Sequence, residues 1–174
     1  PLFATLDLSG TVGWFTSLYP LTLSAGQSGM KDIIITIKEH RREIKDNGVG
    51  YGILSQLHDN SGCKSNGGEH PQILFNYLGQ VDVSTDHEER EFQLAAEAMG
   101  SNLHRDALRE FPIAINGHVR DNKLTFVVDY SINLFSAATI ALLCENFKAA
   151  LMATVEHCVA QTRHLTVSDV PYVT

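Results

Sequence analysis

The stretch FPIAINGHVRDNKLTFVVDYS, residues 111–131, carries the clearest secondary-structure pattern in this chain. Apolar and polar residues alternate through FPIAINGHV and again through LTFVVDYS, which is the period of a strand with one face against a core. The residues RDNK join the two runs, and Asp121-Asn122 suits the tight turn of a hairpin because both residue types tolerate a left-handed backbone. The sequence therefore predicts a β-hairpin here.

A long helix is predicted directly after this hairpin, from about residue 136 to residue 161. Ser136 is a residue type that caps helices well, because its hydroxyl accepts a hydrogen bond from a free backbone N–H. Apolar residues then recur at three- and four-residue spacings, which predicts one buried stripe. The stripe consists of Ile140, Leu143, Phe147, Leu151, Val155 and Cys158.

A second long helix is predicted over residues 28–46, where apolar residues recur at helical spacings between charged ones. Asn47-Gly48 then predicts a helix stop, since glycine supplies the left-handed conformation that other residues avoid. A shorter helix is expected to begin near Tyr51.

Other segments are rich in residues that favour strands. Residues 2–8 and 12–23 contain many Leu, Phe, Tyr, Thr and Val and few charges, which predicts extended structure, and residues 72–83 predict a buried strand. Residues 60–71 are typical of a surface loop, and residues 84–100 fit either a helix or a loop with one helical turn. Strands interleaved with two long helices predict an α/β fold, a two-layer sandwich with a mixed sheet.

The composition is that of one globular domain. The 174 residues, of which 44% are apolar and 19% charged, are enough for a single sizeable core. A formal net charge of −7 without a Lys/Arg-rich stripe argues against a nucleic-acid partner. The longest apolar runs, such as IIIT and AATIALLC, are shorter than a bilayer span, so we expect no membrane partner.

The cysteines and histidines suggest neither a disulfide framework nor a metal site. Cys63, Cys144 and Cys158 are far apart and form no C-x-x-C pair. None of the eight histidines pairs with another ligand type at metal-binding spacing on a predicted helix or strand. The chain also lacks an N-x-[ST] glycosylation site, and together these features predict a cytoplasmic protein.

Glycines alternate in GVGYG, residues 48–52, yet this pattern does not predict a nucleotide site. A dinucleotide-binding loop needs a third glycine where Ile53 stands, and it follows a strand rather than a helix. We interpret these glycines instead as backbone that passes close to another segment.

The stretch FNYLGQ, residues 75–80, places Asn76 and Tyr77 inside an otherwise apolar strand. Polar groups in such a position are either hydrogen-bonded within the core or face a cavity. Residue chemistry alone leaves both interpretations open.

Three separated stretches, TVGWFTSLYP at 11–20, NGVGYG at 47–52 and FNYLGQ at 75–80, together resemble the last three core motifs of epimerization domains of nonribosomal peptide synthetases, in the same order and spacing. Condensation domains, a sister family, carry a G-x-F-V-N type of sequence where this chain has Trp14-Phe15-Thr16. The resemblance implies a chloramphenicol-acetyltransferase-like lobe. It also implies that residues 1–174 form the C-terminal lobe of a two-lobed domain, whose N-terminal lobe, H-H-x-x-x-D-G motif and E-G-H-G-R motif lie outside this sequence.

The reaction that the resemblance implies is inversion of the α-carbon of an aminoacyl or peptidyl thioester, an isomerase activity. No cofactor would be bound directly, because the substrate arrives on the phosphopantetheine arm of a peptidyl carrier domain, and neighbouring synthetase modules would be partners. Such chemistry needs proton-transfer groups on both sides of the α-carbon and donors aimed at the enolate oxygen. The resemblance makes Tyr77 and Asn76 the catalytic candidates and Trp14, Thr16 and Tyr51 candidates for the substrate tunnel.

One position departs from the family pattern. Gly10 stands where the motif has an arginine before Thr11, and glycine supplies neither charge nor hydrogen bonds from a side chain. A weakened or inactive epimerization domain that docks a carrier protein is therefore one alternative, and a condensation-type lobe that forms amide bonds is another.

Overall fold

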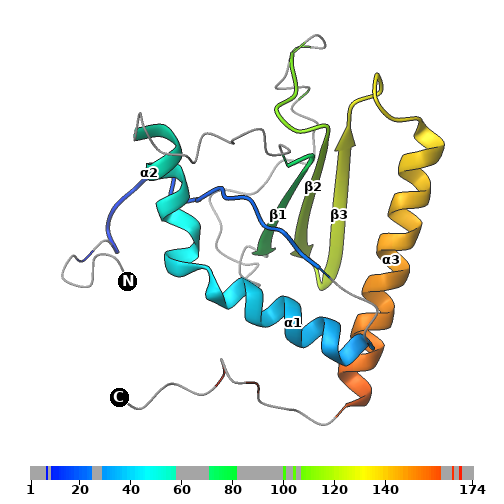
Figure 1. The fold of residues 1–174 in the computed structure, drawn as a ribbon. Coiled ribbons are helices and arrows are strands. Elements are labelled where there is room, and N and C mark those ends of the chain that lie inside the picture. Colours follow the sequence, from blue (N-terminus) through cyan, green and yellow to red (C-terminus); the bar gives the residue numbers. More distant parts are fainter. Residues whose placement is uncertain are drawn as a thin grey trace, which may run out of the picture. The chain divides into compact units, whose positions relative to one another are not determined.

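The computed structural model describes residues 9–24, 29–57, 71–81 and 107–161, together with the single residues 7, 100, 104, 166 and 169. The chain divides into two compact units, which we call the sheet unit (residues 71–147) and the helical unit (residues 1–70 and 148–174). The elements are α1 (Met30–Glu43), η1 (Lys45–Gly48), α2 (Val49–Leu57), β1 (Ile73–Gln80), β2 (Ile113–Arg120), β3 (Lys123–Tyr130) and α3 (Ala137–Ala160), and Figure 1 labels all of them except η1.

The sheet unit confirms the predicted mixed α/β architecture. Its three described strands have the order β1-β2-β3, with β1 parallel to β2 and β2 antiparallel to β3. The predicted hairpin is β2 and β3, and its two turn residues, Asp121 and Asn122, have φ of 50° and 58°. Positive φ at both central positions is the geometry whose twist matches that of the flanking strands.

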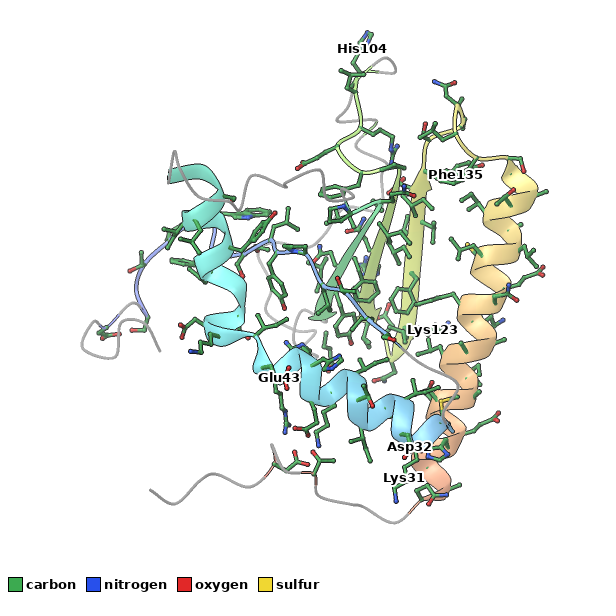
Figure 2. All side chains as sticks on the ribbon, in the orientation of Figure 1. Lys31, Asp32, Glu43, His104, Lys123 and Phe135 are labelled. Atoms are coloured by element: carbon green, nitrogen blue, oxygen red, sulfur yellow. The ribbon has the colours of Figure 1, made fainter. Side chains whose placement is uncertain are left out.

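The core of the sheet unit lies between one sheet face and the first turns of α3. Ile113 and Ile115 of β2 are buried against Ile140 of α3. Partly buried apolar residues surround them, namely Phe126, Val128, Tyr130, Phe135, Leu143 and Cys144 (Figure 2 labels Phe135). Alternate residues of each strand reach this face, as the period-two pattern predicts.

Helix α3 begins where the sequence predicts. The Thr139 backbone N–H donates to Ser136 Oγ at 3.1 Å, which confirms Ser136 as the cap. The predicted stripe is buried or half-buried as far as Leu151, whereas Val155 and Cys158 are exposed, so the stripe is wrong at its end. In the last two turns Thr154 is half-buried instead, and its hydroxyl donates to Met30 Sδ of α1 at 3.7 Å, because burial of a helical face depends on a neighbour and not on periodicity alone.

Helix α3 also bears on the membrane prediction. By length and composition alone it is the one described helix that could cross a bilayer, although no single apolar run in the sequence is long enough. A helix that packs its apolar residues on a sheet passes the same test, and Ile140 is buried in this way.

In the helical unit, α1 is shorter than the predicted helix over residues 28–46. Ile44 leaves the helix with an extended backbone, φ −72° and ψ 109°. Three left-handed residues follow: Asp46 and Asn47, each with φ near 50°, and Gly48 with φ 78°. The helix therefore ends before the predicted stop at Asn47-Gly48, whereas the left-handed conformation predicted for Gly48 is confirmed. Helix α2 begins two residues before the predicted Tyr51.

Residues 9–24 contain no strand, so the β-favouring composition of residues 12–23 does not lead to a paired strand here. Val12, Trp14 and Phe15 are exposed, and the exposed fraction of Trp14 is 89%. β-favouring composition sets a tendency, but a strand needs a partner whose backbone groups pair with its own. No described strand pairs with this segment.

The remaining sequence predictions have mixed outcomes. The strand predicted over residues 72–83 is confirmed as β1, but its residues alternate between half-buried and exposed instead of being buried on both faces. The predicted loop over 60–70 and the helix or loop over 84–99 lie outside the described residues, as do residues 2–6 and 8 of the first extended segment.

Candidate functional site

The two catalytic candidates, Asn76 and Tyr77, lie on opposite faces of the sheet. Phe75 shares a face with Phe126, their ring centroids being 6.2 Å apart, and strand alternation places Tyr77 on that same face. The pairing of the strands places Tyr77 on the same face, because Tyr77 pairs with Gly117 and Gly117 pairs with Phe126. Asn76 therefore faces the other way, and a substrate held against one face meets only one of the two side chains directly.

Asn76 has a polar partner on the neighbouring strand. It pairs in register with Asn116 of β2, and its Nδ2 donates to Asn116 Oδ1 at 3.4 Å. Both residues are half-buried between apolar neighbours on their strands. This contact is the internal hydrogen bond that a polar group inside an apolar strand requires.

Tyr77 lies at the uncovered margin of the core face. Its exposed fraction is 51%, and within the described part of the chain no hydrogen bond involves its hydroxyl. Beside it, Phe126 packs edge-on against Phe147 of α3, with ring centroids 5.0 Å apart. A phenol that extends from an aromatic surface, and whose hydroxyl has no hydrogen-bond partner among the described residues, is available to donate to a bound group.

The glycine of FNYLGQ forms a β-bulge directly after Tyr77. The β1–β2 register shifts by one residue between Tyr77 and Gln80, and Gly79 within the shift has φ 74°. Glycine adopts such a conformation without the Cβ penalty of other residues. Bulges redirect side chains and end regular pairing, so this one sets the point where the Asn76-Tyr77 segment leaves the ladder.

The helical unit joins the other two motif stretches. Ser17 Oγ donates to the carbonyl oxygen of Asn47 at 2.7 Å. The Tyr19 ring lies against Gly48, and a Cβ on Gly48 would stand 2.1 Å from a ring carbon. The interpretation of GVGYG as a close backbone approach is confirmed at Gly48, whereas Gly50 and Gly52 have open space around them.

The tunnel candidates Trp14, Thr16 and Tyr51 are all exposed in this unit. Thr16 precedes Ser17, and Tyr51 lies on α2 directly after the left-handed turn. The described residues do not enclose any of the three side chains, so their assignment to a tunnel stays a prediction.

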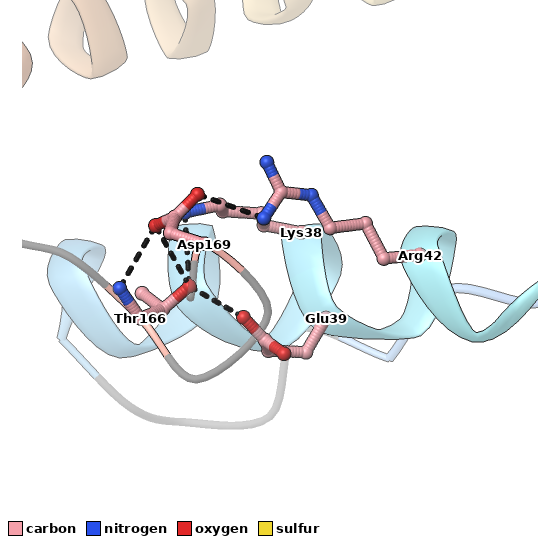
Figure 3. Close-up of polar contacts among 5 residues, drawn as sticks. All are labelled: Lys38, Glu39, Arg42, Thr166 and Asp169. Atoms are coloured by element: carbon pink, nitrogen blue, oxygen red, sulfur yellow. Dashed lines mark hydrogen bonds and ion pairs between the residues drawn. The ribbon is translucent and has the colours of Figure 1, made fainter. Parts of the chain in front are cut away.

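A second polar cluster links α1 to the C-terminal segment. Asp169 accepts hydrogen bonds from Lys38, from Arg42 Nη1 at 2.8 Å and from the Thr166 backbone N–H at 2.8 Å (Figure 3). The Thr166 hydroxyl lies 2.5 Å from Glu39 Oε1 and accepts from Lys38 Nζ at 2.9 Å. We call these five residues the tail clamp.

The Asp169 carboxylate of the tail clamp is surrounded by two positive charges and a backbone N–H. The exposed fraction of the Asp169 side chain is 18%. The Lys38 ammonium, the Thr166 N–H and the Arg42 guanidinium hold the pKa of the Asp169 carboxyl well below its usual range.

Sequence reasoning missed several of these residues. Asn116 stands between two apolar positions of a strand, the same signal that singled out Asn76, but alternation predicted it on an outer face. Lys38 and Asp169 carry no local signal, because residues 131 positions apart are brought together only by the fold. No cluster of three potential metal ligands occurs among the described residues.

Comparison with known proteins gives a consistent family. The chain matches the condensation domain family over residues 4–170. It is 38% identical over 154 residues to bacitracin synthase 3 of Bacillus licheniformis and 33% identical over 171 residues to surfactin synthase subunit 2 of Bacillus subtilis (strain 168). These alignments cover 88% and 97% of this chain but only 2% and 5% of those synthases.

A solved structure extends the likeness to the fold. The epimerization domain from the third module of tyrocidine synthetase B superposes with a TM-score of 0.77 at 29% identity. The match covers 91% of this chain and 35% of that domain structure, so the chain spans about a third of its solved relative.

Proposed function

Because the chain belongs to the condensation domain family, we propose that it is the C-terminal lobe of an epimerization domain in a nonribosomal peptide synthetase. The observation that carries this proposal is the likeness in sequence and fold to a solved epimerization domain over nine-tenths of the chain. The three motif stretches support the same choice over condensation. Partners are then the N-terminal lobe, a peptidyl carrier domain and neighbouring modules, all in the cytoplasm.

The proposed reaction inverts the α-carbon of a carrier-bound aminoacyl or peptidyl thioester from L to D. A base removes the α-proton, the electrons of that C–H bond move onto the thioester carbonyl oxygen, and an acid returns a proton to the other face of the carbon. The phosphopantetheine arm of the carrier presents the thioester and stays bonded to it throughout. The protein must stabilise the enolate oxygen and keep the two proton-transfer groups on opposite sides.

Tyr77 is the residue of this chain that we assign to the enolate oxygen. A phenol can donate a hydrogen bond and also transfer a proton, whereas the amide of Asn76 can do only the first. The half-exposed ring of Tyr77 suits this role, as does its hydroxyl, which has no hydrogen-bond partner within the part of the chain that the structure describes. Asn76, on the opposite face, then acts by orienting the strand or the substrate amide.

The test uses this chain joined to the preceding lobe of its domain, with an L-aminoacyl thioester on a carrier domain in deuterated water. We expect deuterium to enter the α-position with loss of stereochemistry. Removing one donor to a developing oxyanion costs about 10²- to 10³-fold in rate, so Tyr77→Phe should slow exchange by that factor.

Tyr130→Phe is the matched control, since Tyr130 lies on the same sheet face within the core, and it should leave the exchange rate unchanged. Amide formation with an acceptor thioester, in place of exchange, would show a condensation-type lobe. Binding of the carrier without either reaction would show a docking lobe.

A further inference from the structure

We propose that Asn116 is a positioning residue that holds the Asn76-Tyr77 segment in its productive orientation. The inference rests on the proposed function, and it concerns how β1 is fixed immediately before the bulge. Asn116 contacts Asn76 and has no described contact with Tyr77 itself, so its effect on Tyr77 passes through Asn76.

The Asn76–Asn116 contact lies near the end of the regular β1–β2 ladder. Regular β1–β2 pairing runs from Ile73 to Tyr77 and is interrupted before Gln80. The Asn76–Asn116 hydrogen bond is the last side-chain tie between the strands before that interruption. A bulge leaves one residue unpaired and bends its strand, so the segment in front of it needs another restraint.

Asn76 depends on Asn116 for its side-chain hydrogen bond within the described residues. Leu74 and Leu78, which flank Asn76 on β1 two positions away, are apolar and cannot hold its amide. Within the described residues, Asn116 is the side chain that hydrogen-bonds to Asn76. Losing that acceptor would leave a half-buried amide unsatisfied, and the strand would relax to reach water.

Asn76 and Tyr77 lie on opposite faces of β1. A tie on the Asn76 face fixes the rotation of β1 about its own axis, and that rotation directs Tyr77 on the other face. A cross-strand amide pair therefore controls the phenol without approaching the substrate.

The experiment measures deuterium exchange in the two-lobed protein for Asn116→Leu and Asn116→Asp. Leucine removes the acceptor at similar size, whereas aspartate still accepts from Asn76 Nδ2. We expect kcat for Asn116→Leu to fall about 10-fold with KM within twofold, and Asn116→Asp to keep at least half of the wild-type kcat. Thr125→Val, a control on the same sheet face that lies opposite His118 and not opposite Asn116, should leave both constants unchanged.

A double-mutant comparison separates positioning from a general loss of stability. In a Tyr77→Phe background, Asn116→Leu should lower kcat by less than twofold, since the group it positions is already lost. An equal 10-fold loss in both backgrounds, no loss in either, or equal losses for leucine and aspartate would overturn the proposal.

A structural readout keeps this inference distinct from the proposed function. If the wild-type protein exchanged no deuterium, the proposed function would fail, and the NMR signals of the Tyr77 ring would decide the positioning role. Asn116→Leu should shift them and Asn116→Asp should not. Identical Tyr77 signals in wild type and Asn116→Leu would overturn the inference.

Discussion

Gly48 in the helical unit and Gly117 in the sheet unit both lie beneath an aromatic ring, for different reasons. A Cβ on Gly48 would stand 2.1 Å from the Tyr19 ring, and a Cβ on Gly117 would stand 2.4 Å from the Phe126 ring. Gly48 in addition has φ 78°, whereas Gly117 lies in a regular strand without positive φ. The comparison teaches that packing alone can require glycine, and that a left-handed turn adds a separate conformational requirement.

The largest effect is expected for Gly48→Ala. The left-handed backbone costs a non-glycine residue about 1–2 kcal/mol, and forcing the Tyr19 ring aside costs about 1–3 kcal/mol more. We expect the free energy of unfolding of the two-lobed domain to fall by about 3 kcal/mol in chemical denaturation. Gly50→Ala, in α2 with open space around it, should leave stability unchanged or raise it by up to about 1 kcal/mol.

A rescue experiment tests the two-part cost at Gly48. Replacing the Tyr19 ring with a small side chain, as in Gly48→Ala combined with Tyr19→Ser, removes the clash. It does not remove the free-energy cost of the left-handed backbone. Rescue should therefore be partial. Full recovery would mean that packing alone requires this glycine, and the contrast with Gly117 would disappear.

Gly117→Ala is expected to cost about 2 kcal/mol, because only the ring must move. Phe126 packs between Phe75 and Phe147, which limits where it can go. Combining Gly117→Ala with Phe126→Leu should destabilise by at least about 1 kcal/mol less than the sum of the single changes, since the smaller side chain makes room for the new methyl group. Strict additivity of the unfolding free energies would contradict the packing explanation.

A smaller and more local effect is expected at the tail clamp of the helical unit. Asp169→Asn removes the charge that pairs with Lys38 and Arg42, so amide hydrogen exchange around residues 166–169 should speed up while β2 and β3 stay protected. Equal protection of residues 166–169 in variant and wild type would show that the clamp does not hold this segment.

The pH dependence of the clamp follows from the lowered pKa of Asp169. A carboxyl whose pKa is lower in the folded state contributes its full stability above the unfolded value of about 4, and loses it only as pH falls through the folded value. Carbon-13 NMR titration of the Asp169 carboxyl should show it ionised from pH 7 down to pH 4. A midpoint at an ordinary aspartate pKa would mean that Lys38 and Arg42 do not hold the carboxylate.

The smallest effect on stability is expected at a third glycine, Gly10. No atom lies within 4 Å of a Cβ placed there, and its φ is not in the positive range. Gly10→Arg should therefore change the free energy of unfolding by less than about 0.5 kcal/mol. The same variant restores the arginine of the family motif, so an increase in deuterium exchange would show that this residue limits the activity.

Local chemistry explains which features could be predicted from the sequence. The hairpin at Asp121-Asn122 and the turn at Gly48 could be predicted from a few neighbouring residues, because each depends on backbone conformations that few residue types adopt. The helix cap at Ser136 and the first turns of α3 could be predicted because a capping residue and a helical spacing of apolar residues are also local signals. Asn76 and Tyr77 stand out because their polarity interrupts an apolar run.

The failures concern features that depend on distant residues. Residues 12–23 have the composition of a strand, but the partner that would pair with them is not specified by that composition. The need for glycine at position 117 depends on Phe126, across the hairpin, and the contact of Asn76 with Asn116 depends on the β1–β2 register. No periodicity in one segment contains that information.

The bulge at Gly79 changes which residues of β1 lie on each face of the sheet. Up to Tyr77, odd-numbered residues share the face of Phe126, whereas after the inserted residue the even-numbered Gln80 pairs with Val119 and takes that face. Deleting Gly79 would leave Asn76 and Tyr77 paired with β2 as before. It would also restore the regular alternation of side chains between the two sheet faces from Tyr77 to Gln80. The one extra residue of this bulge thus decides that Gln80, and not its neighbour, lies on the same face of the sheet as the phenol.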